Sequence, residues 1–239
     1  MTPPGPGEIF AALEASWPPQ ERVSCGPFVL RRDESTSQRT LAATQSAEHF
    51  TDSDIDTAET QMRAWGQTPL FQIRPEHGTL DTALAARGYQ KADPSLLYLE
   101  VTSKLVGDLP SARAWPVWPP LACQREIWAQ GGLDPGRIAV MERAAEPRVS
   151  ILGRTGDSPA GATFLGALGS IAMLHAVEVD ASMRRRGVAR QMMVAAANWC
   201  AENGIDWLSL IVTEANRAAI AFYERAGFVR VGSYHYRKQ

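Results

Sequence analysis

Apolar residues in the second half of the chain recur at spacings that predict strands first and then alternating helices and strands. Short apolar and β-branched runs bounded by Gly, Pro or Asn predict strands at residues 149–152, 161–166, 171–179, 207–212 and 228–237. Beyond Gly187, apolar side chains follow helical spacing until Asn203, and a second helix is expected over residues 215–226. A run of antiparallel strands followed by strand–helix–strand–helix–strand indicates a mixed α/β sheet with layered helices.

The first half of the chain contains the same kinds of segment. Helices are expected at residues 8–15, 36–50, 55–65 and 80–87, and strands at residues 23–32, 70–73 and 96–101. Between residues 102 and 120, the pairs Leu109-Pro110, Trp115-Pro116 and Trp118-Pro119 break any long helix and favour extended backbone. We expect this segment to cross between the two halves, and helices to follow it at residues 121–129 and 135–144.

A local repeat links the two halves. Residues 84–89 and 223–228 both read as the end of a helix, then Gly, then an aromatic residue, and each leads into a strand. Gly88 and Gly227 suit the left-handed position that ends a helix. The repeat predicts two related halves, with a mixed, mostly antiparallel twisted sheet and helices on both faces. The expected divisions are residues 1–105 for an N-terminal domain, 106–120 for the crossing segment and 121–239 for a second domain.

Composition and charge narrow the class of protein. The 239 residues are 45% hydrophobic and 21% charged, with 19 Gly and 16 Pro, which is typical of a soluble globular protein. The net charge of −2 argues against a nucleic-acid-binding protein. The charge is unevenly spread: residues through Lys104 have nine Lys and Arg against fourteen Asp and Glu, and the remainder has fifteen against twelve. The second half therefore suits an anionic ligand better than the first.

The three cysteines offer no metal site or disulfide framework. Cys25, Cys123 and Cys200 are far apart and form neither a CxxC pair nor a Cys/His ligand spacing. We therefore expect reduced thiols and no metal. The first residues resemble no signal peptide, and no stretch reaches the ~20 apolar residues of a membrane helix. These features predict a cytoplasmic protein without a membrane partner.

One segment of the second half carries the chemistry. After the strand that ends at Val179, a short loop brings three arginines, and a helix then opens at a glycine and small residues. Exposed N–H groups of a first helical turn, the helix dipole and arginine side chains together favour a phosphate group. The candidate phosphate-binding residues are Arg184, Arg185, Arg186, Gly187, Val188, Ala189 and Arg190. A solvated basic turn is the alternative interpretation of this loop taken alone.

A second segment supports the phosphate interpretation. Residues 216–228 place an Asn, small residues and a Tyr on one helix, followed by the Gly–aromatic turn. With the arginine loop, it resembles the GNAT superfamily of acyl-CoA-dependent N-acetyltransferases. Arg184-Arg185-Arg186-Gly187-Val188-Ala189 matches that superfamily's [RQ]-x-x-G-x-[GA] loop. Asn216, Ala219, Tyr223 and Gly227-Phe228 match its later N-x-x-A-x-x-x-Y-x-x-x-G-F helix.

The resemblance implies an acetyl-CoA site and a role for each matching residue. Val177 and Val179 would pair their backbone with the pantetheine arm, and loop amides would hold the pyrophosphate. Asn216 and Ala219 belong to the helix that borders the cosubstrate. Tyr223 would protonate the departing thiolate, although without the motif it reads as a half-buried helix aromatic. The first half lacks the arginine loop and has Leu84 where Tyr223 aligns, so it resembles a degenerate acetyltransferase half that does not bind CoA.

Transfer to an amine also requires a base. In a regular strand, His175 shares one face with Val177 and Val179, while Glu178 lies on the other. Histidine has an unperturbed pKa near 6.5 and is suited to accept a proton. We therefore expect His175 to be the base. Glu178 is the second candidate because a bulge would reverse the parity, a water is the third, and a buried core histidine is the structural alternative for His175.

These observations predict a GNAT-type N-acetyltransferase. It would transfer an acetyl group from acetyl-CoA to a primary amine of a small molecule or peptide by direct attack in a ternary complex, since no cysteine lies in either motif. The alternative is a non-catalytic acyl-CoA-binding sensor or assembly module. Nucleic-acid binding through the arginines is disfavoured, because no aromatic residues are interleaved with them. The sequence identifies neither the acceptor nor the oligomeric state.

Overall fold

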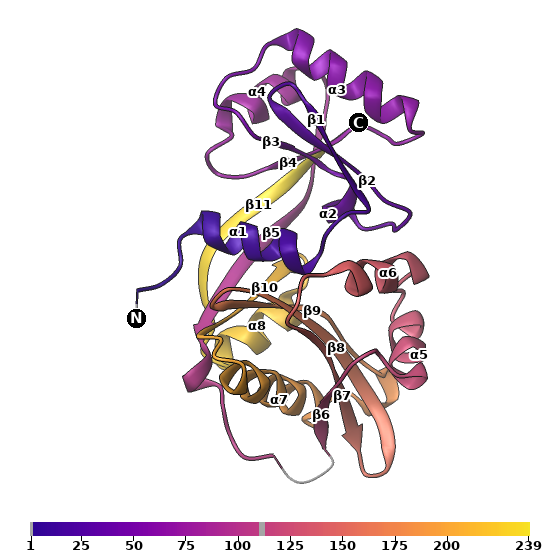
Figure 1. Cartoon of the computed structure of the whole chain (residues 1–239), viewed down its shortest axis with the longest axis vertical. Helices are drawn as coiled ribbons and strands as arrows, with labels where there is room; N and C mark the ends of the chain where they lie inside the picture. The colour runs from indigo at the N-terminus through magenta and orange to yellow at the C-terminus, as the bar shows by residue number, and fades with distance from the viewer. Residues whose placement is uncertain (1, 110–112) are drawn as a thin grey trace. The chain divides into compact units, whose positions relative to one another are not determined.

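The computed structural model describes residues 2–109 and 113–239, which form two compact units (Figure 1). Unit 1 consists of Met1–Pro18, Leu97–Ile211 and Ala221–Val231. Unit 2 consists of Pro19–Leu96, Val212–Ile220 and Gly232–Gln239. Residues 110–112 of the expected crossing segment lie outside the described residues. Among the described residues, no helix has the length and apolar character needed to span a bilayer.

The strands of unit 1 are hydrogen-bonded in the order β5–β10–β9–β8–β7–β6. Their bounds are β5 (Gln90–Val101, of which the end belongs to this unit), β6 (Ala114–Val117), β7 (Arg148–Thr155), β8 (Ser158–Leu168), β9 (Ile171–Val179) and β10 (Trp207–Thr213). Strands β6 to β9 pair antiparallel in succession, whereas β9 and β10 pair parallel. The helices are α1 (Pro6–Ser16), α5 (Ala122–Gln130), α6 (Pro135–Arg143), α7 (Val188–Glu202) and the end of α8 (Arg217–Arg225), with 3-10 turns η1 (Thr102–Lys104) and η2 (Ala181–Met183).

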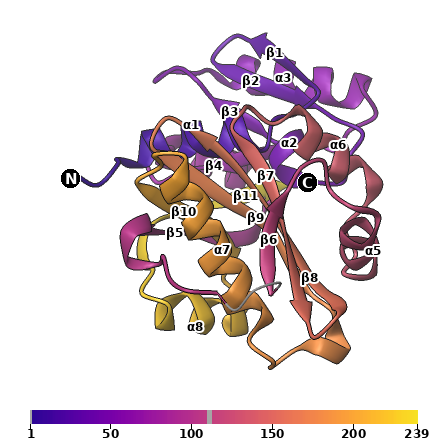
Figure 2. The same ribbon diagram turned by 60° about the horizontal axis from the view of Figure 1, so that its bottom comes forward.

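Helices cover both faces of these strands, and glycines allow them to approach closely. A Cβ at Gly161 of β8 would lie 2.9 Å from the side chains of Val188 and Met192, so α7 covers this face (Figure 2). A Cβ at Gly166 would lie 2.9 Å from the side chain of Ser16, so α1 covers the opposite face. Residues of opposite parity on β8 thus face different helices, as the pleat requires.

Unit 2 has its own strands, helices and core. Its strand order is β1–β2–β3–β4–β11–β5. The bounds are β1 (Glu21–Cys25), β2 (Phe28–Arg32), β3 (Ala43–Gln45), β4 (Leu70–Ile73) and β11 (Val229–Lys238), with helices α2 (Gln38–Leu41), α3 (Asp52–Ala64) and α4 (Gly78–Ala86). The core centres on Phe71, whose ring meets Phe28 and Tyr89 edge-on at 5.6 and 5.7 Å.

The two units repeat one topology. Strands β1, β2 and β3 pair antiparallel and β3 pairs parallel with β4, as β7, β8, β9 and β10 do in unit 1. Helices α3 and α4 occupy the same places in the order as α7 and α8. The last strands are exchanged, because β5 ends in unit 1 and β11 ends in unit 2, where Arg237 pairs with Phe71. The mixed, mostly antiparallel α/β fold is confirmed.

The compact units do not follow the order of the chain. Unit 1 contains the first 18 residues and the end of β5, although both precede its other strands. The boundaries expected at residues 105 and 120 stay a prediction about the two related halves. They do not describe which residues pack together.

Three local expectations differ from the structure. The helix expected over residues 36–50 is wrong, since only Gln38–Leu41 is helical and Ala43–Gln45 is a strand. Serine and threonine side chains compete for the backbone here: the Thr40 hydroxyl donates to the Ser37 carbonyl. The single strand expected at residues 23–32 is a hairpin that turns at Gly26, with φ +55°. Strand β6 lies in the segment expected to be only extended, at the edge of the sheet where Pro116 is tolerated.

Candidate active site

A β-bulge interrupts strand β9 opposite β8. Glu178 pairs with Ala162 and His175 pairs with Phe164, so three steps along β9 match two along β8. Ala176 has a left-handed φ of +49°, which accommodates the extra residue. Directly opposed residues of an antiparallel pair share a face, and therefore His175 and Glu178 both lie on the face that α1 covers. The expectation that His175 shares a face with Val179 is wrong, because Val179 pairs with Gly161 on the α7 face.

His175 is buried beneath helix α1. The residue is only 3% exposed, and its Nε2 atom lies 2.8 Å from the Ser16 hydroxyl oxygen. The imidazole packs 4.9 Å from the Trp17 ring and stacks on Phe164 at 6.1 Å. These contacts are those of a hydrogen-bonded core histidine. Its role as the base stays a prediction.

Glu178 has a more open position on the same face. Its side chain is 26% exposed, and its Oε1 accepts a hydrogen bond from Nη2 of Arg184 at 3.2 Å. The bulge brings this carboxylate to the side of the sheet that α1 covers, close to Gly131 at the end of α5, rather than under α7. Glu178 therefore combines solvent access with a fixed strand position, which a proton acceptor needs.

Strands β9 and β10 stop pairing with each other near this bulge. The last residue pair between them joins Leu174 to Leu210, and β9 runs on to Val179. Val177 and Val179 lie in this extension, and both residues are half-buried. The extension is where the family resemblance expects the pantetheine arm to pair with a strand.

The loop after β9 leads into an open helix N-terminus. Asp180 accepts hydrogen bonds from the Ser182 amide at 2.8 Å and hydroxyl at 2.6 Å, and these bonds lower the pKa of its carboxyl. Arg184, Arg185 and Arg186 are exposed, and Arg185 has φ +64°. In the described chain, Gly187 is the N-cap of α7 and supplies no side-chain cap, and the first turn contains no acidic residue. Its amides and dipole can therefore receive an anion.

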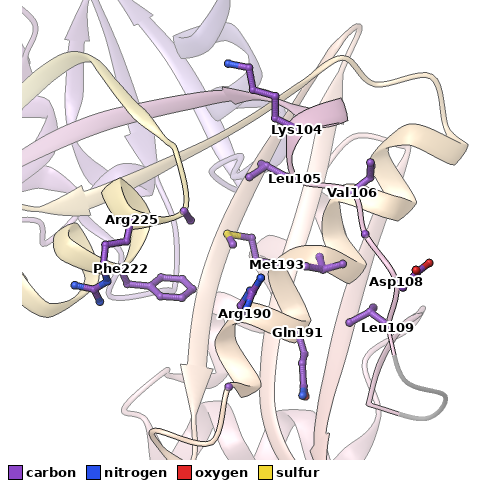
Figure 3. Close-up of a pocket in the computed structure, with 14 residues that line it drawn as sticks. Lys104, Leu105, Val106, Asp108, Leu109, Arg190, Gln191, Met193, Phe222 and Arg225 are labelled. Atoms are coloured by element: carbon purple, nitrogen blue, oxygen red, sulfur yellow. The ribbon is translucent and has the colours of Figure 1, made fainter.

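A pocket of about 800 Å³ lies beside this N-terminus in unit 1. Figure 3 shows Arg190 and Met193 on α7, with the Phe222 ring turned towards Arg190 from α8. Arg225 and residues 104–109 also line the pocket. The Asn198 side chain clamps this last segment to α7, accepting from the Gly107 amide at 3.1 Å and donating to its carbonyl at 2.9 Å. Cationic and apolar walls together suit a ligand with phosphate groups and apolar parts.

Tyr223 lies on the buried side of α8. Its residue is 7% exposed, and its ring meets Phe222 and Phe228 at 5.2 and 5.7 Å. Burial raises the pKa of the phenol, which keeps it protonated at neutral pH. At neutral pH the Tyr223 hydroxyl is therefore a possible proton donor and not a base.

The other expected residues of the second motif serve the helix itself. The Asn216 side chain accepts a hydrogen bond from the Ala219 amide at 3.1 Å, which caps the start of α8. Both residues lie in the stretch Val212–Ile220 of unit 2, and neither is among the residues that line the pocket. Their contribution to cosubstrate binding stays a prediction.

Sequence reasoning missed three contributors to this region. Trp128 of α5 donates its indole N–H to the Ala176 carbonyl at 2.8 Å. Arg225 and the segment 104–109 line the pocket. Arg225 lies within the second motif and its charge was a usable signal, whereas nothing in the local pattern of residues 104–109 or 128 indicates these contacts.

Comparison with known proteins agrees with this geometry. Residues 114–228 match the family model described as "Acetyltransferase (GNAT) family". These residues therefore form a domain of the GNAT family of N-acetyltransferases. The match covers the strands β6 to β10 and both helices that border the pocket, and membership in the GNAT family implies the use of acetyl-CoA.

Similarity to individual proteins extends beyond residues 114–228 of this chain. The chain is 26% identical to the mycothiol acetyltransferase of Thermobispora bispora, covering 92% of this chain and 76% of that protein. It is 24% identical to the uncharacterized N-acetyltransferase YobR of Bacillus subtilis, covering 96% and 97%. A solved GCN5-related N-acetyltransferase from Kribbella flavida has a TM-score of 0.75 at 19% identity, covering 98% and 96%. The GNAT-like fold thus extends over the whole chain.

Proposed function

We propose that this GNAT protein transfers an acetyl group from acetyl-CoA to a primary amine of a small molecule or peptide, by direct attack in a ternary complex. The observation that carries the proposal is the bulge in β9. It turns Glu178 towards the face opposite α7, while the α7 N-terminus and the pocket beside it remain open to a phosphate-bearing cosubstrate.

Acetyl-CoA would be held by backbone and by cations. The amides of residues 185–190 and the α7 dipole receive the pyrophosphate, with Arg190 and Arg225 adding charge at the pocket wall. The backbone of Val177 and Val179 pairs with the pantetheine arm along the part of β9 that extends beyond its last pair with β10.

The chemical step requires one proton acceptor and one proton donor. The lone pair of the neutral amine attacks the thioester carbonyl carbon, a C–N bond forms, and the C–S bond breaks with its electron pair going to sulfur. Glu178 accepts the proton that leaves nitrogen, directly or through water. Tyr223 gives its phenolic proton to sulfur, and transfer of one proton through solvent from Glu178 to Tyr223 restores both residues.

Glu178 suits the role of base better than His175. The glutamate is partly exposed, whereas the imidazole is buried against Ser16 and Trp17. A covalent acyl-enzyme is disfavoured, because neither motif contains a cysteine and burial raises the pKa of the Cys200 thiol in α7 to about 12.

Free-thiol release from acetyl-CoA, measured with a panel of primary amines, tests the proposal. We expect amine-dependent release with a mass increase of one acetyl group on the amine. Glu178→Gln keeps the size of the side chain and removes its basicity, so kcat should fall about 10²- to 10⁴-fold. His175→Asn is the comparison variant, and a larger loss there would restore histidine as the base. Tight CoA binding without turnover on any amine would instead indicate an acyl-CoA sensor.

A further inference from the structure

Helix α5 and the glycine that follows it approach the bulged end of β9 at two points, and neither point lies among the residues that line the pocket. Trp128, which is 1% exposed, donates its indole N–H to the carbonyl of Ala176 at 2.8 Å. Ala176 is the residue with the left-handed φ of +49°. The indole therefore provides a hydrogen-bond partner for a carbonyl that the bulge takes out of the regular strand ladder.

The end of the same helix approaches Glu178 itself. Gly131 follows α5, and a Cβ at this position would lie 2.7 Å from Cγ, Cδ and Oε2 of Glu178. The absence of a side chain leaves room for the carboxylate where it now lies. Any larger residue at position 131 requires the Glu178 side chain to move.

Helix α5 is anchored independently of these two contacts. Gln124, which is fully buried, accepts hydrogen bonds from the Ser150 hydroxyl of β7 at 3.2 Å and from the Leu121 amide at 2.9 Å. A helix that is held at its start by β7 can act as a fixed support for β9. The Trp128 hydrogen bond is thus not needed to attach the helix, and it can instead fix the position of the bulge.

We infer that helix α5 and the residue after it position the catalytic carboxylate: Trp128 holds the bulge that turns Glu178 to the face that α1 covers, and Gly131 leaves the space in which its carboxylate lies. The inference rests on the proposed function, in which Glu178 is the base. Trp128 and Gly131 are positioning residues and touch neither substrate.

A double-mutant cycle in the full-length protein tests the role of Trp128. Trp128→Phe keeps an aromatic ring but removes the indole N–H, and we expect kcat to fall about tenfold because the carboxylate is displaced. The Kd for acetyl-CoA should be unchanged, since the pocket is lined by α7, α8 and residues 104–109. In the Glu178→Gln background, the same substitution should change kcat less than about twofold. An equal loss of kcat in both backgrounds overturns the inference, because Trp128 would then act independently of Glu178.

A second variant keeps the test decisive if Trp128→Phe does not fold. Gly131→Ala adds one methyl group against Glu178 and leaves the bulge intact, and we expect kcat to fall several-fold with the Kd for acetyl-CoA unchanged. Gly7→Ala in α1 is the matched control, because a Cβ there meets nothing within 4 Å, and its kcat should equal that of the wild type. Unchanged kcat in Gly131→Ala overturns the inference for this position.

The same measurements separate failure of the inference from failure of the proposed function. If Glu178→Gln retains full kcat, Glu178 is not the base and both proposals fail. If Glu178→Gln is impaired while the α5 variants act additively with it, only the positioning role of α5 fails.

Discussion

The two units differ most where a strand leads into the first long helix of the repeated topology. In unit 2, α3 begins with reciprocal caps: the Asp54 amide donates to the Thr51 hydroxyl, and the Asp54 carboxylate accepts from the Thr51 amide. Asp52 adds a second negative charge to the first turn. In unit 1, α7 begins at Gly187 with φ +82° and follows three arginines. One helix start is closed to anions, and the other attracts them.

The corners that end the later helices differ only in their side chains. The Tyr89 amide donates to the Leu84 carbonyl at 3.0 Å, and the Phe228 amide donates to the Tyr223 carbonyl at 3.1 Å. Gly88 and Gly227 both have positive φ, at +85° and +100°. The backbone frame is shared, but Leu84 has no proton to donate. A few side chains at two junctions thus distinguish the unit to which we assign acetyl transfer from the other unit.

The largest expected effect comes from separating the halves. A fragment of residues 103–239 lacks α1 and the following Trp17, whose ring packs on His175 and Phe164, and it lacks the end of β5. Burying a large apolar side chain contributes about 1.5–3 kcal/mol, and α1 supplies several, so we expect the fragment not to fold. Circular dichroism and thermal melting against the full chain measure this. Cooperative melting of the fragment would show that the second half folds alone.

The next largest effect concerns the open helix start. Gly187→Glu places a carboxylate at the α7 N-terminus, and we expect loss of CoA binding by more than about 100-fold through repulsion of the pyrophosphate. Gly187→Asn is the control, because asparagine tolerates a left-handed backbone without adding charge. Isothermal titration with CoA compares the two. Similar losses in both variants would assign the effect to the backbone, and retained binding in Gly187→Glu would place the cosubstrate elsewhere.

Each of the paired corners contains a tyrosine, at different positions of the repeat: Tyr223 aligns with Leu84, and Tyr89 aligns with Phe228. Tyr223→Phe should lower kcat towards the low end of the roughly 10²- to 10⁴-fold range of acid–base groups, since a thiolate is a fair leaving group, with unfolding free energy little changed. Tyr89→Phe should instead lower the unfolding free energy without changing kcat. It removes a hydrogen bond of 3.0 Å to buried Glu59, which costs about 1–3 kcal/mol of stability. Turnover and denaturant unfolding distinguish them. A full kcat in Tyr223→Phe, with chemistry shown to be rate-limiting, removes this tyrosine from the mechanism.

The smallest effects concern two aspartates: Asp54 in the first turn of α3, and Asp180, which caps the 3-10 turn η2 before α7. Hydrogen bonds from Ser182 lower the pKa of Asp180, and those from Thr51 lower the pKa of Asp54. A carboxyl with a lowered folded-state pKa contributes stability above its unfolded pKa and loses it as the pH falls through the folded value. Melting temperatures between pH 6 and pH 3 should therefore depend less on pH in Asp54→Asn and Asp180→Asn. Only Asp180→Asn should also weaken CoA binding, by a few-fold. An equal effect on CoA binding in both would contradict the contrast between the units.

Much of the site was predictable from local sequence. Three arginines before Gly187, and the Asn-to-Tyr spacing from Asn216 to Tyr223, mark a helix start and a helix whose geometry follows from neighbouring residues. The paired Gly–aromatic corners are equally local, since one left-handed residue sets each turn. The stretch 36–50 shows the limit of local rules: its spacing favours a helix, but side-chain hydrogen bonds and pairing of β3 with β2 and β4 overrule it.

The family resemblance, the arginine-rich helix start and the asymmetry between the halves were predictable from sequence, because each depends on residues adjacent in the chain or one helical turn apart. The face that Glu178 occupies, the residues that complete each unit and the lining of the pocket all depend on contacts made in the folded chain. No glycine or proline at Ala176 indicates the bulge in the sequence. The bulge depends on the register between β9 and β8 and on the hydrogen bond from the Trp128 indole. Packing α1 against His175 and exchanging the last strands join residues far apart in the chain. Such contacts depend on the combined burial of many distant side chains, which no local pattern of residues records.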